Sequence, residues 1–115
     1  MGRKHYHDYA IFDSEDISTD QESRVTSVKN LDKASVHVYW NGTAPIGVLE
    51  IEVRNGEKAP WYTLPIGSVI NITGNSGYHQ IVLNELPFSD IKLKYISTSG
   101  TGTMDAKIAM KTVGA

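Results

Sequence analysis

Hydrophobic and polar residues alternate along most of the chain after residue 33, with the two-residue period of a strand that buries one face. The clearest case is VLEIEV, which places Leu49, Ile51 and Val53 on one face and two glutamates on the other. Strands are expected at seven segments: 34–40, 48–53, 61–65, 68–73, 78–83, 91–97 and 103–113. No window of ordinary helix length shows a convincing helical period, so we predict an all-β chain.

Segments rich in glycine, asparagine and proline separate these strands at intervals of about 8–12 residues. This spacing is typical of an antiparallel sandwich or barrel rather than of β-α-β units. We therefore predict an antiparallel β-sandwich, jelly-roll-like, with about 7–8 strands. The sandwich domain is expected over residues 34–115. Residues 1–33 are expected to form an N-terminal arm, partly extended, with one or two strands.

The glycine-rich run STSGTGT at 97–103 has two interpretations. A phosphate-binding loop needs glycines between a strand and a helix, usually with a lysine followed by serine or threonine. Here Gly102 is followed by Thr103 and Met104, and the next segment alternates like a strand. A hairpin bend between two strands is the better interpretation, since glycine permits the positive φ of such a turn.

Size and charge exclude several classes of protein. The 115 residues fit one domain, and the net charge of −2 argues against binding nucleic acid, which needs a basic surface. The chain has no cysteine, which excludes disulfides and thiolate chemistry. No apolar run is long enough to span a membrane, and no apolar segment follows the basic start as in a secretory signal. Synthesis in a cytoplasm is therefore expected.

Few residues suggest catalysis or metal binding. Glu50 and Glu52 share a strand face about 6.5–7 Å apart, which overlaps glycosidase geometry, but such pairs commonly decorate the wet face of a sheet. His5 and His7 with Asp8 form either a small metal site or a solvated chain start, and we favour the second. No serine lies in a GxSxG motif. We expect a non-enzymatic protein with no metal and no other cofactor.

Aromatic residues suggest an interaction surface. Alternation places Tyr39 and Trp40 on opposite faces of one strand, and the same argument applies to Trp61 and Tyr62. Exposed aromatic rings stack on sugars or anchor protein interfaces, whereas the tryptophans serve equally well as core residues. The candidate binding residues, for a protein partner or a glycan, are Tyr39, Trp61, Tyr62 and Tyr78.

The order ASVHVYWNGTAPIGVLEIEVRNG, then WYTL, then IKLKYISTSGTGTMDAKIAMKTVGA resembles a type of small β-sandwich virion structural protein of bacteriophages. The resemblance covers residues 34–115 and rests mainly on turn glycines and alternating strand residues. Arg54 stands where these proteins often have serine before the asparagine-glycine turn. The resemblance implies a capsid decoration protein, head fibre, spike or tail-associated module, and it carries no catalytic residues.

The expected function is therefore that of a virion structural protein, made in the host cytoplasm, which assembles on or in the particle through symmetric contacts. The expected partners are other virion proteins, such as major capsid or tail proteins, and further copies of the chain, for example in a trimer. The alternative is a carbohydrate-binding module that recognises a host glycan. The residues 1–33 are either a tether for assembly or a loose terminus. The candidate assembly residues in this arm are Arg3, Lys4, Tyr6, Tyr9 and Phe12.

Overall fold

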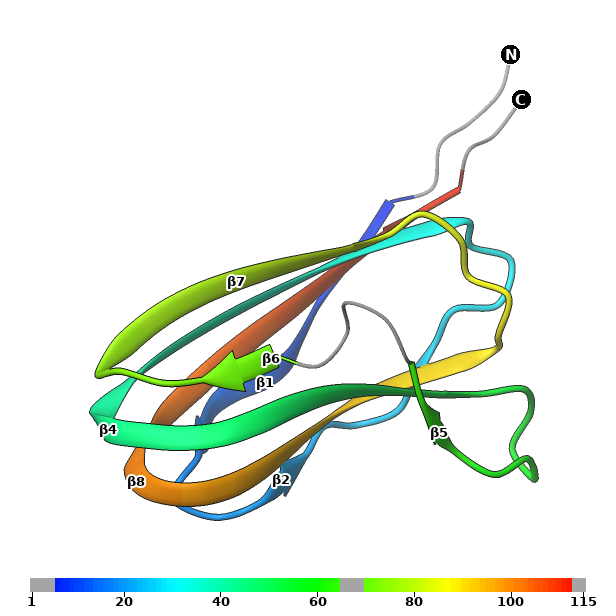
Figure 1. The fold of residues 1–115 in the computed structure, drawn as a ribbon. Helices are drawn as coiled ribbons and strands as arrows, with labels where there is room; N and C mark the ends of the chain where they lie inside the picture. Colours follow the sequence, from blue (N-terminus) through cyan, green and yellow to red (C-terminus); the bar gives the residue numbers. More distant parts are fainter. Residues whose placement is uncertain (1–5, 65–69, 113–115) are drawn as a thin grey trace.

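The structure is a computed structural model that describes residues 6–64 and 70–112, with only the backbone of Tyr6 and His7, and in these residues it contains strands and no helix (Figure 1). The strands are β1 (Tyr6–Asp16), β2 (Gln21–Glu22), β3 (Thr26–Ser27), β4 (Lys33–Arg54), β5 (Tyr62–Thr63), β6 (Ile70–Ile72), β7 (Ser76–Leu83) and β8 (Asp90–Lys111). Every pairing is antiparallel. The predicted all-β antiparallel sandwich is confirmed, and its jelly-roll-like order stays a prediction.

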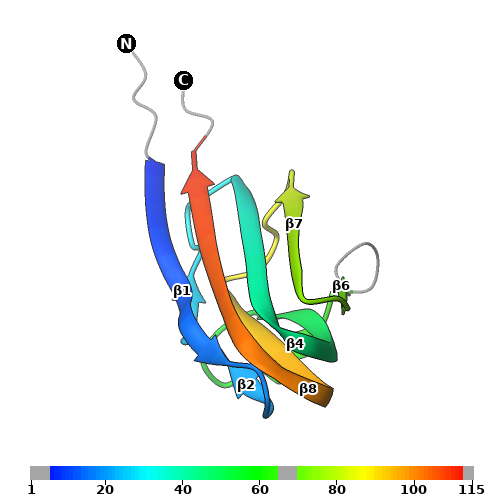
Figure 2. The same ribbon diagram turned by 90° about the vertical axis from the view of Figure 1, so that its left-hand side faces the viewer.

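A single ladder between β4 and β8 organises the fold. Each strand has 22 residues, and they pair from Lys33–Lys111 at one end to Arg54–Asp90 at the other. Midway both strands bend, so that the two halves of the ladder lie over one another as two layers (Figure 1). β1 and β7 flank the ladder in the first layer, giving the order β1-β8-β4-β7 (Figure 2). In the second layer, β2 and β3 pair with β8, while β5 and β6 pair with β4.

The predicted hairpin at residues 97–103 is wrong. This run lies inside β8, and residues 41–47, which also carry turn signals, lie inside β4. The two halves of β8 do not pair with each other, because each half pairs with a different half of β4. All seven predicted segments do contain strand, but four of them merge into two long strands. Residues 65, 68–69 and 113 of those segments lie outside the described residues.

Glycine makes the bend possible. Gly100 has φ +84° and Ala44 has φ +48°, and the pairing register shifts between Thr43 and Gly47. Gly42 faces Gly102 across the ladder, and a Cβ on Gly42 would overlap the carbonyl oxygen of Thr101. The two backbones therefore approach each other more closely at the bend than side chains would permit.

The core lies between the two layers and follows the predicted alternation. Leu49, Ile51 and Val53 are fully buried, and Trp40 is buried while Tyr39 is exposed. The second half of β8 buries its alternate residues in the same way, namely Met104, Ala106, Ile108 and Met110. Two β-sheet faces that alternate in this way bury their apolar side chains against each other, which is the main stabilising contribution to a sandwich.

The segment predicted as an arm enters the sandwich. β1 pairs with β8 from Tyr6–Lys111 to Asp16–Thr103, and β2 and β3 pair with the first half of β8. Four described residues of this segment belong to the core: Ile11, Phe12, Ile17 and Val28. Phe12 is only 2% exposed, so its proposed part in assembly contacts is wrong. A side chain that closes the chain's own core has no surface to offer a partner.

Substitution Gly42→Ala is expected to lower the free energy of unfolding by about 2–3 kcal/mol, because the added methyl group meets a backbone carbonyl that cannot rotate away. Urea denaturation measures the change. The neighbouring exposed substitution Thr43→Ala is the control and should cost no more than about 0.5 kcal/mol. Equal stability of the two variants would contradict the close approach at the bend.

Substitution Phe12→Ala is expected to lower the free energy of unfolding by about 3–5 kcal/mol, since it opens a cavity between the layers. Asp13→Ala, at the exposed next position, is the matched control and should unfold like the unmodified protein. Thermal unfolding followed by circular dichroism distinguishes them. If the Phe12→Ala variant has normal stability, β1 does not contribute to the core, and residues 6–16 form an arm that is separate from the sandwich.

Candidate functional site

Two of the predicted aromatic residues lie together on the outer face of the first layer. Tyr39 of β4 and Tyr78 of β7 are register partners, and their side chains are 39% and 60% exposed. The Tyr78 hydroxyl lies 3.0 Å from Nδ1 of His37, and the two rings are 6.0 Å apart at 59°. The hydrogen bond to His37 and the packing of the two rings hold the Tyr78 ring in a defined position. An exposed aromatic ring that is fixed in this way can serve as part of a binding surface.

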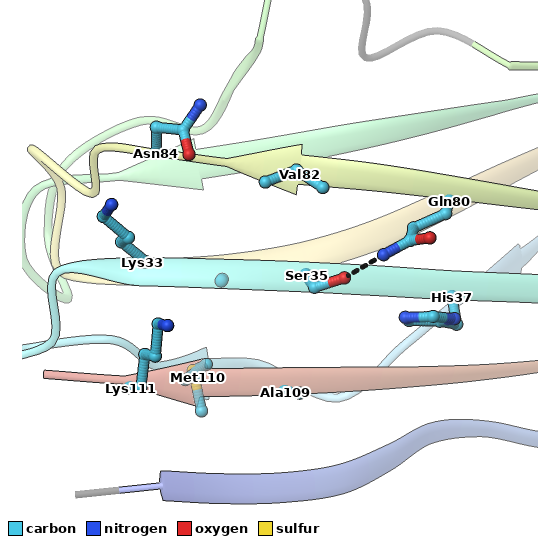
Figure 3. Close-up of a pocket in the computed structure, with 10 residues that line it drawn as sticks. Lys33, Ser35, His37, Gln80, Val82, Asn84, Ala109, Met110 and Lys111 are labelled. Atoms are coloured by element: carbon cyan, nitrogen blue, oxygen red, sulfur yellow. Dashed lines mark hydrogen bonds between the residues drawn. The ribbon is translucent and has the colours of Figure 1, made fainter. Parts of the chain in front are cut away.

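The same face is hollowed on both sides of His37. One shallow depression of about 280 Å³ is lined by Tyr39, Tyr78, Asp8 and Lys107. A second, of about 420 Å³, extends towards the end of the ladder at which Lys33 pairs with Lys111 (Figure 3). Its lining residues are Lys33, Ala34, Ser35, His37, Gln80, Val82, Asn84, Ala109, Met110 and Lys111. The face therefore combines aromatic rings, hydrogen-bonding groups and charged residues, and both of these described hollows are shallow.

The other two predicted aromatic residues lie in the second layer. The Trp61 ring has the Arg54 guanidinium and the Lys92 ammonium group each 4.5 Å from its centre. Arg54 also pairs with Asp90 at 2.9 Å. Tyr62 lies in the short strand β5, opposite Val53, and is exposed. Trp61 is thus held in two cation–π contacts on the protein's own surface, and the four predicted residues do not form one site.

The predicted pair of carboxylates belongs to this charged surface. Glu52 lies 3.7 Å from Nζ of Lys92, which also pairs with Glu22 at 3.1 Å. Glu50 lies opposite Lys94 in the ladder and accepts a hydrogen bond from the Thr63 hydroxyl at 3.4 Å. Cross-strand pairs of opposite charge stabilise a sheet, and this accounts for both glutamates without a reaction. The described residues contain no group of three metal-ligating side chains.

Three of the predicted assembly residues of the arm, Tyr6, Tyr9 and Phe12, lie in β1. Arg3 and Lys4 lie outside the described residues, and Tyr6 is described only through its backbone pairing with Lys111. Tyr9 is exposed and lines shallow hollows beside β3. Of these residues, Tyr9 is the one whose described side chain is exposed, and the part of the others in assembly stays a prediction, apart from the buried Phe12.

Sequence reasoning missed the contact between Tyr78 and His37 and the stack of Arg54 and Lys92 on Trp61. Alternation puts His37 and Tyr39 on one face of their strand, so the sequence alone placed His37 on the face where it contacts Tyr78. The position of Tyr78 beside His37 depends on the pairing of β4 with β7, which the local pattern does not specify. Likewise, Lys92 reaches Trp61 only because β8 and β5 both flank β4.

Comparisons with known proteins reveal likeness in fold. No protein-family model matches the chain, and no curated protein matches it. Among solved structures, the chain is similar to the SPBc2 prophage-derived protein YomS, with a TM-score of 0.63 and 12% identity, over 95% of this chain and 96% of that one. The likeness to YomS therefore extends over nearly the whole of both chains.

The chain is also similar to structures of infectious bursal disease virus. A chain from the Gx strain matches with a TM-score of 0.67 and 12% identity, over 96% of this chain and 32% of that one. The D431N mutant VP2 protein of the same virus, in derived T=1 particles, matches with a TM-score of 0.58 and 12% identity, over 96% and 32%. The chain spans about a third of the length of these viral chains. At such identities the shared property is the sandwich fold.

Within residues 6–64 and 70–112, no helix is long and apolar enough to cross a membrane.

Proposed function

We propose that this chain is a non-enzymatic structural protein of a virus particle, which assembles on or in the particle through symmetric protein contacts. The observation that carries the proposal is the likeness over nearly the full length of both chains to a prophage-derived protein, together with the likeness to a third of a viral chain. The position proposed for it is that of a capsid decoration protein or of a spike or tail-associated module. Its proposed partners are the major capsid or tail proteins.

The physical properties of the sandwich support this role. Its described core residues form one cluster within a single chain, and the exposed aromatic face and the sheet edges are available for contacts with other molecules. The hollows are shallow, and the two glutamates that would be considered for hydrolysis are engaged with Lys92 and Thr63. A protein that works by surface complementarity needs rigid, repeated surfaces and no enclosed pocket.

The test is to mix the purified protein with particles, and separately with the capsid and tail proteins, of the genome that encodes it. We expect it to sediment with the particles or with one of those proteins in a fixed ratio, because many copies occupy equivalent positions. An unrelated protein of similar mass controls for trapping in the pellet. Failure to bind every virion protein of that genome would overturn the proposal.

A second candidate function is glycan binding by the outer face of the first layer. The observation that favours it is the pairing of Tyr39 with Tyr78 beside His37, Gln80 and a hollow lined by polar groups. Aromatic rings at such a surface stack on the apolar faces of sugars, while the neighbouring polar groups bond their hydroxyls. Trp61 is less suited to this role, since its ring already contacts two cations.

If a glycan binds this face, Tyr39→Ala and Tyr78→Ala should each weaken binding by about tenfold or more, which corresponds to about 1.4 kcal/mol. Tyr62→Ala removes an exposed tyrosine from the other layer and should leave the affinity unchanged. A glycan array followed by titration calorimetry makes the comparison. Equal losses in all three variants, or no glycan bound, would contradict a site at Tyr39 and Tyr78.

A further inference from the structure

The two edges of the first layer are built differently. β1 forms one edge and β7 the other (Figure 2). β1 carries four acidic residues and two register shifts, features that discourage another strand from pairing with an edge. β7 reads SGYHQIVL, with no acidic residue, no lysine or arginine and no proline, and it pairs with β4 throughout its length. No strand in the described part of the chain pairs with its outer side.

Among the described residues, no strand pairs with the outward backbone hydrogen-bonding groups of β7. The Gly42 N–H donates to the carbonyl of Asn75 at 2.7 Å, so the backbone groups of Asn75 face β4. This bond identifies which residues along β7 direct their N–H and C=O groups towards β4 and which direct them away from it. Because inward and outward groups alternate, the N–H groups of Gly77, His79, Ile81 and Leu83 point to β4. Those of Ser76, Tyr78, Gln80 and Val82 point away from it. Alternate carbonyls point outward from the same residues.

The side chains at this edge leave its backbone accessible. The Tyr78 hydroxyl contacts His37 at 3.0 Å. The Gln80 amide donates to the Ser35 hydroxyl at 3.0 Å (Figure 3). Both side chains therefore extend inward across β4 and not outward over the edge. Val82, another of the four residues with outward backbone groups, is apolar and 57% exposed. The edge thus combines free backbone groups with exposed apolar surface.

We propose that β7 is a self-pairing edge, to which the β7 strand of a second copy of this chain adds in antiparallel orientation about a two-fold axis. The first layers of the two copies then form one continuous sheet. This inference rests on the proposed function, whose symmetric contacts it places at a specific strand. The contact it describes is two-fold and forms a dimer, whereas the trimer given above as an example of a homo-oligomer would need a different contact.

The sequence of β7 is suited to pair with itself. With the axis at Gln80, Tyr78 lies opposite Val82 of the partner subunit, and the reverse pair forms on the other side of the axis. Aromatic and β-branched residues opposite each other are favourable cross-strand pairs. This register supplies about six backbone hydrogen bonds from groups that otherwise face solvent. No charged residue of β7 meets its own copy, so charge repulsion within the strand does not oppose the contact.

The test uses Gln80→Pro with Gln80→Ala as its matched control. Proline at this position removes an outward N–H and leaves the ladder to β4 intact, whereas alanine removes only the side chain. Sedimentation and light scattering over a range of concentrations measure the mass. The unmodified protein and Gln80→Ala should rise from 12.7 kDa to about twice that value. Gln80→Pro should dimerise at least tenfold more weakly, with an unchanged circular dichroism spectrum.

Two results would overturn the inference. The first is an unmodified protein that stays at 12.7 kDa at every concentration, and the second is a Gln80→Pro variant that dimerises normally. Neither result affects the outcome of the particle-binding experiment, which tests the proposed function separately. If Gln80→Pro does not fold, amide exchange in the unmodified protein decides. The amides of Tyr78, Gln80 and Val82 should exchange more slowly as concentration rises, and exchange independent of concentration would equally reject the inference.

Discussion

The close approach of two glycine-containing backbones at the bend of β4 and β8 is the constraint on which the rest of this structure depends. Gly42 and Gly102 face each other across the ladder, and Gly100 adopts a positive φ beside Ala44. Because the strands bend together, their hydrogen bonds continue around the corner and the ladder becomes two layers. Every other strand then attaches to a half of one of these two, so the core exists only because the bend does.

The bend also decides which surfaces the protein offers. It leaves the first layer with β1 and β7 as its edges, one acidic and irregular, the other uncharged and regular. It places Tyr39 and Tyr78 on the outer face of that layer, and it gathers Arg54, Trp61 and Lys92 on the second. The first layer therefore carries two neighbouring exposed tyrosines and an open strand edge. In the second layer Tyr62 is exposed alone, and the charged groups around Trp61 pair with one another. This asymmetry is why both proposed contacts fall on the first layer.

Local sequence was a sound guide to strands and to their buried faces. The alternation in VLEIEV and in the last part of β8 predicts the buried residues, because the side-chain period of a strand is a property of its own backbone. The same local signals misled at residues 41–47 and 97–103, where glycine, asparagine and proline suggested turns. Glycine is found both in hairpin turns and where two continuous strands approach each other closely. The two cases differ only in which strand each segment pairs with, and the local sequence does not specify this. Phe12 was misplaced for a related reason, since nothing near it in sequence reveals that β8 lies beside β1.

By itself, therefore, the sequence determined the all-β class, the inward and outward faces of each strand and the lack of catalytic motifs. These follow from periodicity and residue chemistry, which act over a few neighbouring positions. Only the tertiary structure decided that four predicted strands are two, that residues 6–28 belong to the sandwich, and that Tyr78 meets His37. It also decided that β7 is an edge with outward backbone groups. These properties depend on which strands pair, and pairing is set by the burial of all the strands together around one core.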